Sequence, residues 1–554
     1  MEKPWLKRYP PGVPEEIDPA ALPTLVALLE QACARHADRI AFFSLGAALT
    51  YRELERQSAA FAAWLQSIGV AKGDRVALML PNLLQFPVAL LGILRAGCVA
   101  VPCNPLYTPR ELAQQLADAH ATVIVALENF AHTLEAALPQ TTIRHVVITS
   151  VGELLGPLKG RAVDFVLRHV KKSVPAWRLP AAIRFSAALA AGRRRGFHPV
   201  EVVADDLAFL QYTGGTTGVA KGAMLTHGNV AANVAQAHAW VSGMLHEGEE
   251  LVLTALPLYH IFALTANLFT FLRLGARNLL IANARDIASL VKAWRKHPVT
   301  VITGVNTLFN ALLEHPAFAR LDFAPLKVSL GGGMAVHSAV AARWKAVTGV
   351  PLLQAYGLTE ASPAVTVDPL DLPEFNGSIG LPLPSTELVI RDDAGRNLPL
   401  GQIGELCVRG PQVMRGYWQR PDETALVFHA DGFLRTGDLG YIDAEGFVYL
   451  VDRKKDVILV SGFNVYPNEV EEAAMLHPGV REAAAIGVPD ARSGEAVKLF
   501  VVRKDMSLDA AALLTHCRTV LAPYKVPRYV EFCDSLPHTA VGKVLRRALR
   551  EHRS

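Results

Sequence analysis

Cysteine is scarce in this sequence, and the few cysteines present are not clustered. The 554 residues contain six, at positions 33, 98, 103, 407, 517 and 533. No group of cysteines and histidines has the spacing of a zinc site, and a chain of this length does not depend on disulfides to stabilise its core. We therefore expect reduced thiols in a cytoplasmic protein.

Long uninterrupted hydrophobic runs are also missing, although hydrophobic residues make up 51% of the chain. Residues 76–94 and 251–272 lack Asp, Glu, Lys and Arg, and a membrane-spanning helix needs roughly 20 apolar residues. Pro81 and Pro87 interrupt the first stretch and Pro257 the second, which favours buried strand–turn–helix units over a lipid-exposed helix. Pro10 and Pro11 stand where a secretory signal would have its apolar core, so we expect no such signal.

The net charge is small for a chain of this size. It is only +4, which gives no support to nucleic-acid binding through overall attraction. The charge is uneven, because residues 151–200 contain ten Lys or Arg, including Lys171 and Lys172, against Glu153 and Asp164. Two interpretations stay open for this segment: a solvated basic face, or peripheral contact with anionic headgroups on the cytoplasmic face of the inner membrane.

Apolar strands alternate with helices through the first two-thirds of the chain. Residues 50–53 and 108–111 each have the pattern of a capping box that starts a helix. Residues 75–80, 122–125 and 145–148 are short, uniformly apolar strands, which predict parallel sheets covered on both faces by helices. Near Gly377 the pattern changes to antiparallel hairpins, where we expect a small β-barrel.

The chain is too long for one hydrophobic core, and we place a domain boundary in the charged segment 452–456. Beyond it the mixed α/β pattern returns, with a strand at 496–502. The predicted fold class is α/β. We expect a large N-terminal domain of stacked α/β subdomains with the small β-barrel, residues 1–452, and a smaller mobile α+β domain, residues 453–554.

The strongest chemical signal is a glycine- and threonine-rich segment that follows an apolar strand. Glycine lets the backbone turn so that successive amides converge on an anion, while threonine hydroxyls add neutral donors and lysine adds a full charge. This composition predicts a phosphate-binding loop rather than a surface turn. It is not a Walker loop, because the only Gly-Lys pair, Gly542-Lys543, is followed by Val544. The predicted loop residues are Tyr212, Thr213, Gly214, Gly215, Thr216, Thr217, Gly218 and Lys221.

Six further segments accompany this loop in a fixed order: residues 256–262, 331–334, 354–360, 435–438, 452–455 and 541–543. Together they resemble the adenylate-forming superfamily, which includes acyl-CoA synthetases, firefly-type luciferases and peptide-synthetase adenylation domains. The resemblance runs from Trp5 to the C-terminus. Residues 107–112, 303–309 and 460–467 look typical of bacterial long-chain fatty-acyl-CoA synthetases, to which the chain is most similar within the superfamily.

The resemblance implies an AMP-forming long-chain fatty acid:CoA ligase, which adenylates a fatty acid with ATP and then transfers the acyl group to coenzyme A. It implies fatty acid, ATP and CoA as substrates, Mg²⁺ as cofactor and a homodimer. Three alternatives stay open: a ligase for medium-chain or aryl acids, a carrier-protein-loading ligase and, in a different class, a membrane-associated fatty-acid-binding protein with little turnover. A hydrolase is disfavoured because no Gly-x-Ser-x-Gly elbow occurs.

The resemblance also assigns roles to single residues. The expected catalytic residues are Lys543, Glu360, Thr213 and His260, of which Thr213 and Glu360 would also bind the metal. The expected nucleotide-binding residues, besides the loop, are Gly331, Gln354, Ala355, Tyr356, Gly357, Thr359, Asp438 and Arg453. The expected acyl-pocket residues are Ile261, Leu264, Gly304 and Val305. Lys455 would be the hinge, with Ser461, Gly462 and Phe463 along the CoA tunnel.

Several of these roles also make chemical sense. A carboxylate such as Asp438 accepts two hydrogen bonds from a ribose diol, and glycines at 304 and 331 would let an aliphatic tail pass close to the backbone. His260 lies in an apolar stretch, where a histidine that only packs in the core is the alternative. Lys543 is at the far end of the second domain, so it can reach ATP only if that domain closes.

The sequence departs from the superfamily pattern in two places. Ala220 stands where a proline usually precedes the loop lysine, as long-chain members tolerate. Leu264 stands where some relatives have an aromatic acyl-gate residue, which puts that gating scheme in doubt for this chain.

Overall fold

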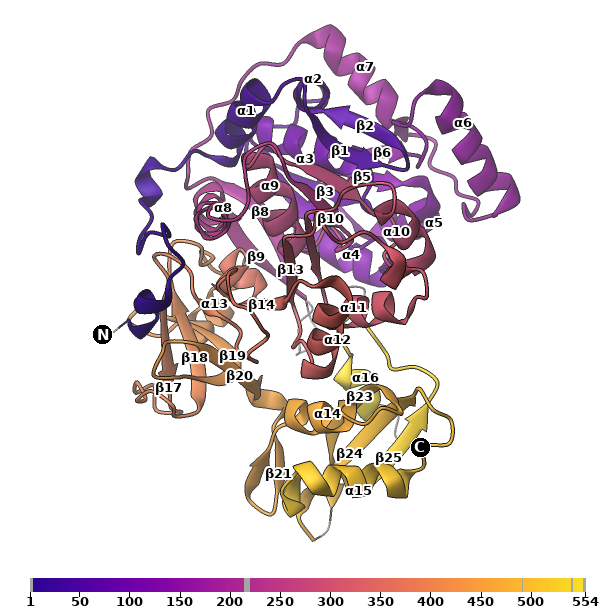
Figure 1. Ribbon diagram of the computed structural model, residues 1–554. Helices are drawn as coiled ribbons and strands as arrows, with labels where there is room; N and C mark the ends of the chain where they lie inside the picture. The colour runs from indigo at the N-terminus through magenta and orange to yellow at the C-terminus, as the bar shows by residue number, and fades with distance from the viewer. Residues whose placement is uncertain (1–2, 214–219, 491, 540–541, 552–554) are drawn as a thin grey trace.

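The computed structural model describes residues 3–213, 220–490, 492–539 and 542–551, arranged as a large N-terminal part and a smaller C-terminal lobe below it (Figure 1). The N-terminal part contains two large sheets and a smaller antiparallel one. The mixed α/β class and the two-part arrangement agree with the expectation. Of the predicted loop, Gly214, Gly215, Thr216, Thr217 and Gly218 lie outside the described residues.

The first large sheet has seven strands in the order β7-β6-β5-β3-β4-β8-β9, all parallel except the β8–β9 hairpin. Alternate side chains point to opposite faces. Val76 and Leu78 therefore pack with α2 (Tyr51–Ser67), α3 (Gln85–Arg95) and α7 (Phe185–Arg195), whereas Ala77 and Met79 pack with α4 (Pro109–Asp118) and α5 (Ala131–Ala137). Both faces are therefore buried. Its strands are β3 (Arg75–Met79), β4 (Val99–Pro102), β5 (Val123–Leu127), β6 (His145–Thr149), β7 (Ile183–Arg184), β8 (Leu207–Thr213) and β9 (Lys221–Thr226).

The helices around this sheet begin where the sequence predicts. Thr50 and Thr108 each cap a helix, and Glu53 and Glu111 return a hydrogen bond to the capping residue, so both capping boxes are confirmed. The helices of this region are α1 (Leu25–Arg35), α2 (Tyr51–Ser67), α3 (Gln85–Arg95), α4 (Pro109–Asp118), α5 (Ala131–Ala137), α6 (Pro157–Phe165), α7 (Phe185–Arg195) and α8 (His227–Val241).

The second large sheet has nine strands in the order β16-β15-β14-β13-β12-β10-β11-β1-β2. Its centre is parallel and its two edges are antiparallel. The strands are β1 (Ile40–Ser44), β2 (Ala47–Thr50), β10 (Leu251–Thr254), β11 (Arg277–Leu280), β12 (Val301–Gly304), β13 (Val328–Gly332), β14 (Leu352–Gly357), β15 (Ala364–Val367) and β16 (Leu381–Pro382). The helical segments η6 (Ala263–Phe269), α9 (Thr270–Arg273), α10 (Ile287–Trp294), α11 (Asn306–Glu314) and α12 (Ser338–Thr348) accompany it.

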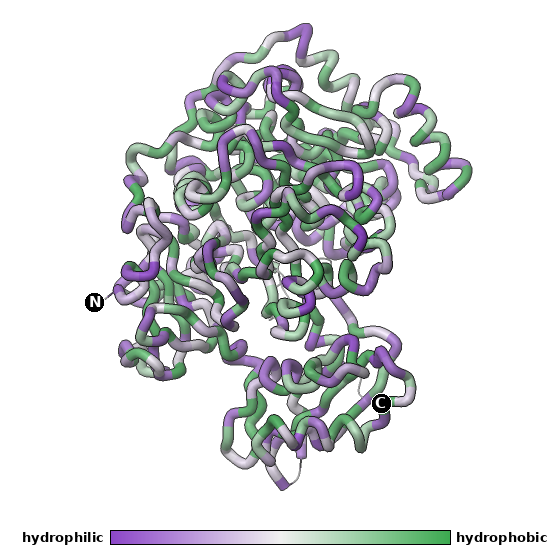
Figure 2. Tube along the Cα trace, viewed as in Figure 1, coloured by the Kyte–Doolittle hydropathy of each residue, from purple (hydrophilic) through white to green (hydrophobic). Residues whose placement is uncertain are grey.

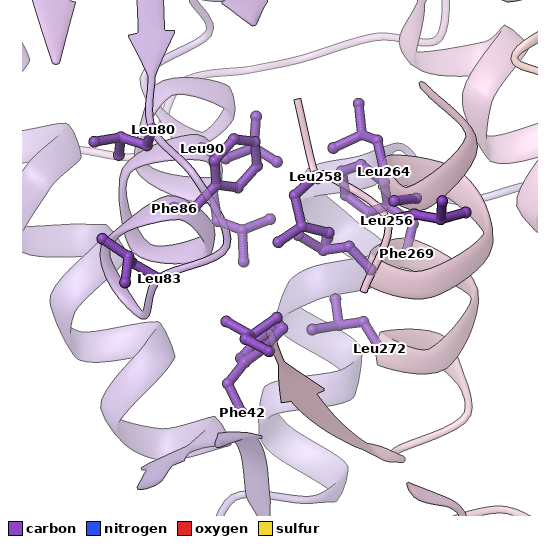
Figure 3. Packing of buried hydrophobic residues seen from close by; sticks show 14 of the residues in the cluster. Phe42, Leu80, Leu83, Phe86, Leu90, Leu256, Leu258, Leu264, Phe269 and Leu272 are labelled. Atoms are coloured by element: carbon purple, nitrogen blue, oxygen red, sulfur yellow. The ribbon is translucent and has the colours of Figure 1, made fainter. Parts of the chain in front are cut away.

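The charge-free stretches of the sequence form the packing between these sheets. Every residue of α3 is buried, and Figure 3 shows Phe86 and Leu90 of this helix facing Leu256, Leu258 and Phe269. Burying such a side chain contributes roughly 1.5–3 kcal/mol, which explains why both stretches lack charge. No helix in the described part of the chain is long and apolar enough to cross a bilayer.

The antiparallel region forms a four-stranded sheet, β17 (Glu387–Arg391), β18 (Gly404–Arg409), β19 (Leu434–Ile442) and β20 (Val448–Arg453). It corrects the expected small barrel, because β17 and β20 are the open edges of this sheet in the described strands. Helix α13 (Pro421–Val427) lies beside it. In the β19–β20 pair Asp438 stands directly opposite Arg453, so the sheet register brings together two of the expected nucleotide-binding residues.

The C-terminal lobe has its own five-stranded sheet and its own apolar cores. Its strands are β21 (Ile458–Val460), β22 (Phe463–Val465), β23 (Val480–Asp490), β24 (Gly494–Arg503) and β25 (Tyr529–Cys533), and its helices are α14 (Pro467–Met475), α15 (Ala510–Val520) and α16 (Arg546–Glu551). The predicted domain boundary lies at the end of β20, where the chain passes from the antiparallel sheet into this lobe.

Candidate active site

A cavity of about 1320 Å³ lies where the carboxyl ends of β12, β13 and β14 meet the four-stranded sheet and the C-terminal lobe. Ligands of open α/β sheets bind at this end of the strands. Residues from elements far apart in the sequence line it. The expected site residues in its wall are Tyr212, Thr213, Lys221, His260, Ile261, Gln354, Ala355, Tyr356, Gly357, Thr359, Glu360, Asp438, Arg453, Lys455 and Lys543.

One end of the cavity is built around the buried carboxylate of Asp438. The Tyr356 hydroxyl donates a hydrogen bond to its Oδ2 at 2.6 Å, and Arg453 Nε lies 3.1 Å from its Oδ1. Burial, together with this carboxylate, raises the pKa of Tyr356 well above 10. A carboxylate can accept about four hydrogen bonds, so Asp438 keeps capacity for a diol.

A second cluster surrounds Glu360 and Lys221. Tyr417 donates its hydroxyl hydrogen to Glu360 Oε1 at 2.7 Å, and Lys221 Nζ lies 5.2 Å from the centre of the Tyr417 ring. Lys221 also forms an ion pair with Glu423. Burial and the Glu360 charge raise the pKa of Tyr417, so it remains a neutral donor. Sequence reasoning missed Tyr417 and Glu423, which stand in no recognisable motif.

Tyr212 lines the cavity with its ring, but its hydroxyl points away from it. The hydroxyl donates to Asp118 Oδ2 at 2.6 Å, and Arg420 pairs with the other oxygen of Asp118. This contact ties the strand that enters the predicted loop to helix α4. Tyr212 therefore anchors the base of the loop.

Lys543 enters the cavity from the C-terminal lobe. Its backbone is held by Thr539, whose Oγ1 accepts a hydrogen bond from Lys543 N at 3.1 Å and whose N–H donates to Lys543 O at 2.7 Å. A side chain at Gly333 would place its Cβ 3.7 Å from Lys543 Cε. Burial, followed by the charge of Arg453, lowers the pKa of Lys543 to about 8.

His260 lies in the same cavity and is kept neutral. Burial, and then the charge of Lys543, lowers its pKa to about 3. Its Nδ1 accepts a hydrogen bond from the Phe262 backbone N–H at 3.3 Å, which leaves Nε2 to carry the proton of the neutral ring. The histidine can therefore donate a hydrogen bond at neutral pH without adding charge.

Three of the four expected acyl-pocket residues do not line the cavity; only Ile261 does. Leu264 packs in the core between the sheets (Figure 3). Val305 is also absent from the cavity wall, and an added Cβ at Gly333 or Gly542 would meet its side chain at 3.8 and 3.2 Å. The space that an aliphatic tail would use at Gly304 is filled by Phe309, whose Cζ lies 2.9 Å from an added Cβ.

Gly331, like Gly304, faces away from the cavity. An added Cβ there would meet Val336 Cγ2 at 2.4 Å, and the residue does not line the cavity. Neighbours in a strand point to opposite faces, so Thr303 and Leu330 face the cavity while Gly304 and Gly331 face away. Strand register, which the sequence does not specify, decides the difference.

The expected CoA-tunnel residues Ser461, Gly462 and Phe463 also lie away from the cavity. They form the exposed tip of the β21–β22 hairpin, where the Phe463 ring is 5.0 Å from that of Tyr524. The C-terminal lobe is therefore turned so that Lys543, and not this hairpin, faces the cavity.

Comparison with known proteins agrees with this arrangement. A family model described as "AMP-binding enzyme" matches residues 29–418, and one described as "AMP-binding enzyme C-terminal domain" matches residues 469–543. The chain belongs to the AMP-binding enzyme family.

The relatives match this chain over nearly the whole of both sequences. A relative named long-chain-fatty-acid–CoA ligase, from Escherichia coli O6:H1, is 58% identical over 552 residues, which cover 100% of this chain and 98% of the relative. The anthranilate CoA ligase AuaEII in complex with anthranoyl-AMP superposes with a TM-score of 0.85 at 26% identity, over 97% of this chain and 98% of that one. ATP-bound MatB from Rhodopseudomonas palustris gives a TM-score of 0.81 at 31% identity, over 95% and 98%.

The cavity also has an apolar arm that sequence reasoning missed. One wall is the face of α8 that carries Ala237, Trp240 and Val241, and the opposite wall is the face of β12 and β13 that carries Val301 and Val328. Trp240 is fixed by a hydrogen bond from its Nε1 to the Asp368 carbonyl at 3.0 Å. These residues share no motif, since only the packing of α8 on the sheet brings them together. The arm residues are Ala237, Trp240, Val241, Leu245, Phe271, Val301, Val328 and Leu330.

Proposed function

We propose that this AMP-binding enzyme is a long-chain fatty acid:CoA ligase. The single observation that carries the assignment is that one cavity joins three features: the carboxylate of Asp438, which suits a ribose, the cation of Lys543 from the C-terminal lobe, and an apolar arm. The name of the relative that is 58% identical over the whole chain supports the same activity. A nucleotide, a fatty acid and a charge-neutralising lysine would then meet in one place.

The reaction we assign has two steps. A fatty-acid carboxylate oxygen attacks the α-phosphorus of ATP, the bond to the β-phosphate oxygen breaks, and pyrophosphate leaves. The sulfur of CoA then attacks the acyl carbonyl carbon, the bond to the AMP oxygen breaks, and the thiol proton passes to solvent. Negative charge accumulates around the reacting atoms in both steps. Their rates therefore depend on positioning the reactants and on neutralising that charge.

The residues of the cavity divide this work. Asp438 would hold the ribose hydroxyls, and Thr213 and Lys221 would contact the phosphates with the loop. Lys543 would neutralise the charge that develops on the α-phosphate and on pyrophosphate. His260 would donate a hydrogen bond to the fatty-acid carboxylate, a role that its neutral ring allows because it adds no repulsion toward Lys543.

Mg²⁺ fits the same cluster only with ATP present. The described residues contain no group of three or more His, Cys, Asp or Glu suited to a metal, and Glu360 with the Thr213 hydroxyl gives two oxygen donors. Mg²⁺ is commonly held by one or two carboxylates, phosphate oxygens and water. We therefore propose that Glu360 and Thr213 would hold Mg²⁺ together with the triphosphate, where the ion supplies further charge neutralisation.

The second step would need a different lobe orientation. In the structure Lys543 lies in the cavity and Gly462 lies outside it, an arrangement suited to adenylation. We propose that residues 453–554 rotate about Lys455 as a lid, withdrawing Lys543 and bringing residues 461–463 to the pantetheine arm of CoA. A homodimer is proposed on the resemblance alone.

The apolar arm provides the test of chain length. Ala237 lies on the α8 face that lines the arm, so Ala237→Phe is expected to fill it. Exchange of pyrophosphate into ATP with palmitate should fall roughly 100-fold, while exchange with hexanoate should stay within about twofold, because each lost methylene contact costs about 1 kcal/mol or more. Ala239→Phe, on the same helix but outside the wall, is the matched control.

Two outcomes would contradict the assignment. If the wild-type chain exchanged pyrophosphate with aryl or medium-chain acids but not with palmitate, it would be one of the related ligases. If no acid supported exchange, the chain would be a binding protein without turnover. Equal loss with both acids in Ala237→Phe would place the acyl chain elsewhere.

We also propose peripheral membrane contact, through the outlying α6 and the π-helical segment η5 (Val166–Val170) that continues it (Figure 1). Hydrophobic and hydrophilic residues both occur along this segment (Figure 2). Leu158, Phe165 and Val170 are 83%, 60% and 68% exposed. Such exposure of large apolar side chains is costly unless another surface covers them.

The inner side of this helix is firmly attached, which leaves the apolar side facing outward. Asp164 accepts hydrogen bonds from Ser150 Oγ at 2.6 Å and from Gly152 N at 2.8 Å. Arg168 pairs with the buried Glu128. The exposed basic residues Lys159, Arg161, Lys171 and Lys172 flank the apolar side chains, a combination that suits an anionic bilayer.

Replacing Leu158 and Phe165 together by serine is expected to lower partition onto phosphatidylglycerol vesicles roughly tenfold, because both side chains lose apolar burial. Co-sedimentation measures it. Leu400→Ser with Ile403→Ser removes comparable exposed side chains elsewhere, 48% and 46% exposed, and should bind like the wild type. Unchanged binding of the first variant, or a change in its oligomeric mass instead, would refute the membrane surface.

A further inference from the structure

One carboxylate of the C-terminal lobe, that of Glu472, binds the N-terminal part of the molecule beside the cavity. Glu472 lies on α14, which runs below α12 in Figure 1. Its Oε1 accepts hydrogen bonds from the backbone N–H of Ser338 at 3.1 Å and from the Ser338 hydroxyl. Its Oε2 lies 2.8 Å from His337 Nδ1.

These contacts supply what α12 lacks at its own start. The residue before the helix, His337, makes no side-chain capping hydrogen bond to it. The first turn of a helix has unpaired N–H groups and favours negative charge, so Glu472 acts as a cap donated by the other lobe. Although burial alone would raise the pKa of Glu472, the hydrogen bonds from His337 and Ser338 hold it below its usual range.

The contacts of Glu472 lie next to the part of the cavity that Lys543 enters. The segment between β13 and α12 contributes Gly333, Met334, Ala335 and His337 to the cavity wall. That segment is fixed from the N-terminal side, because Asn306 Oδ1 accepts from His337 N at 3.0 Å. A cap on Ser338 therefore sets the lobe against a rigid edge of the cavity.

We propose that Glu472 is a positioning residue for adenylation: by capping α12 from the C-terminal lobe, it holds the lobe where Lys543 reaches the nucleotide. This inference rests on the proposed ligase reaction and its two lobe orientations. Rotation to the thiolation orientation must break the cap, so the cap shifts the balance between orientations toward adenylation. Glu472 itself touches no reacting atom.

Glu472→Ala is expected to slow acid-dependent ATP–pyrophosphate exchange roughly tenfold, the effect of losing a cap of ordinary strength. The loss should appear in kcat more than in the KM for ATP, because the ATP-binding residues of the N-terminal part are unchanged. Thiolation of preformed acyl-AMP should be unchanged or faster. Glu469→Ala, on the same helix, removes a pair with Lys525 inside the lobe and is the matched control.

A double variant makes the test specific. If Glu472 acts through α12, Ser338→Ala should add little to Glu472→Ala, because Glu472→Ala has already removed the contact that the Ser338 hydroxyl makes. Equal loss of both half-reactions in Glu472→Ala would mean general damage and would overturn the proposal. So would wild-type exchange in a variant that folds. Absence of exchange in the wild-type chain would instead reject the ligase reaction itself.

Discussion

Replacing Lys543 with alanine is expected to slow adenylation roughly 10²–10³-fold and to leave thiolation of preformed acyl-AMP within about threefold of wild type. The lysine lies in the cavity in the present lobe orientation, and it is the cation that would meet the developing charge of the first step. In the proposed second step the lobe would have turned and the lysine would be withdrawn. Pyrophosphate exchange and single-turnover thioester formation measure the two steps separately.

The pH dependence of pyrophosphate exchange provides a control for the role of Lys543. Lysine is charged below its pKa, and burial lowers that of Lys543 to about 8 in the free protein. Since kcat/KM reports the free enzyme, exchange should be full below this pH and should fall as pH rises through it. Exchange by Lys543→Ala should not show this fall with rising pH. Equal damage to both half-reactions, or an unchanged profile, would show that another group neutralises the charge.

Glu360→Gln is the second change with a large expected effect, a loss of roughly 10²–10³-fold in exchange at ordinary Mg²⁺ concentration. The substitution keeps the shape and the hydrogen bond from Tyr417 but removes the negative charge that would hold Mg²⁺ beside the phosphates. Raising the Mg²⁺ concentration should restore part of the rate, because the lost interaction is metal affinity. A titration of exchange against Mg²⁺ measures this directly.

Tyr417→Phe provides the comparison for that variant. It removes one hydrogen bond to Glu360 Oε1 and leaves the carboxylate in place, so a loss of about three- to tenfold is expected. The Mg²⁺ dependence of this variant should stay close to wild type. If Glu360→Gln showed the same small loss and no change in Mg²⁺ dependence, Glu360 would be a structural partner of Tyr417 and not a metal ligand.

Motifs carried most of what could be predicted about the polar part of the site. Glu360, Asp438, Arg453 and Lys543 lie in segments whose composition and order are distinctive, and the structure places all four in one cavity. Glu360 follows the end of β14 and Arg453 ends β20, while Asp438 lies within β19 directly opposite Arg453, and the packing of these sheets and of the C-terminal lobe brings them together. Tyr417, in contrast, belongs to no such segment, and its contact with Glu360 is visible only in three dimensions.

The acyl site shows the opposite case. Gly304 seemed suited to a tunnel because glycine leaves space, but that space is filled by Phe309 from the next helix. The cavity instead extends over the other face of the same strands, toward Trp240. A shift of one residue along a strand changes which face a side chain occupies, and no composition rule gives that choice.

The sequence by itself determined the α/β class, both capping boxes, the buried nature of the charge-free stretches and the chemistry of the polar groups, because these depend on local pattern and on side-chain type. The tertiary structure alone decided which strand face the cavity uses, that the four-stranded sheet stays open, and that Lys543 and Glu472 of the C-terminal lobe meet the N-terminal part. These features arise from packing between elements distant in the chain, where register and lobe orientation are fixed by contacts that no local segment contains.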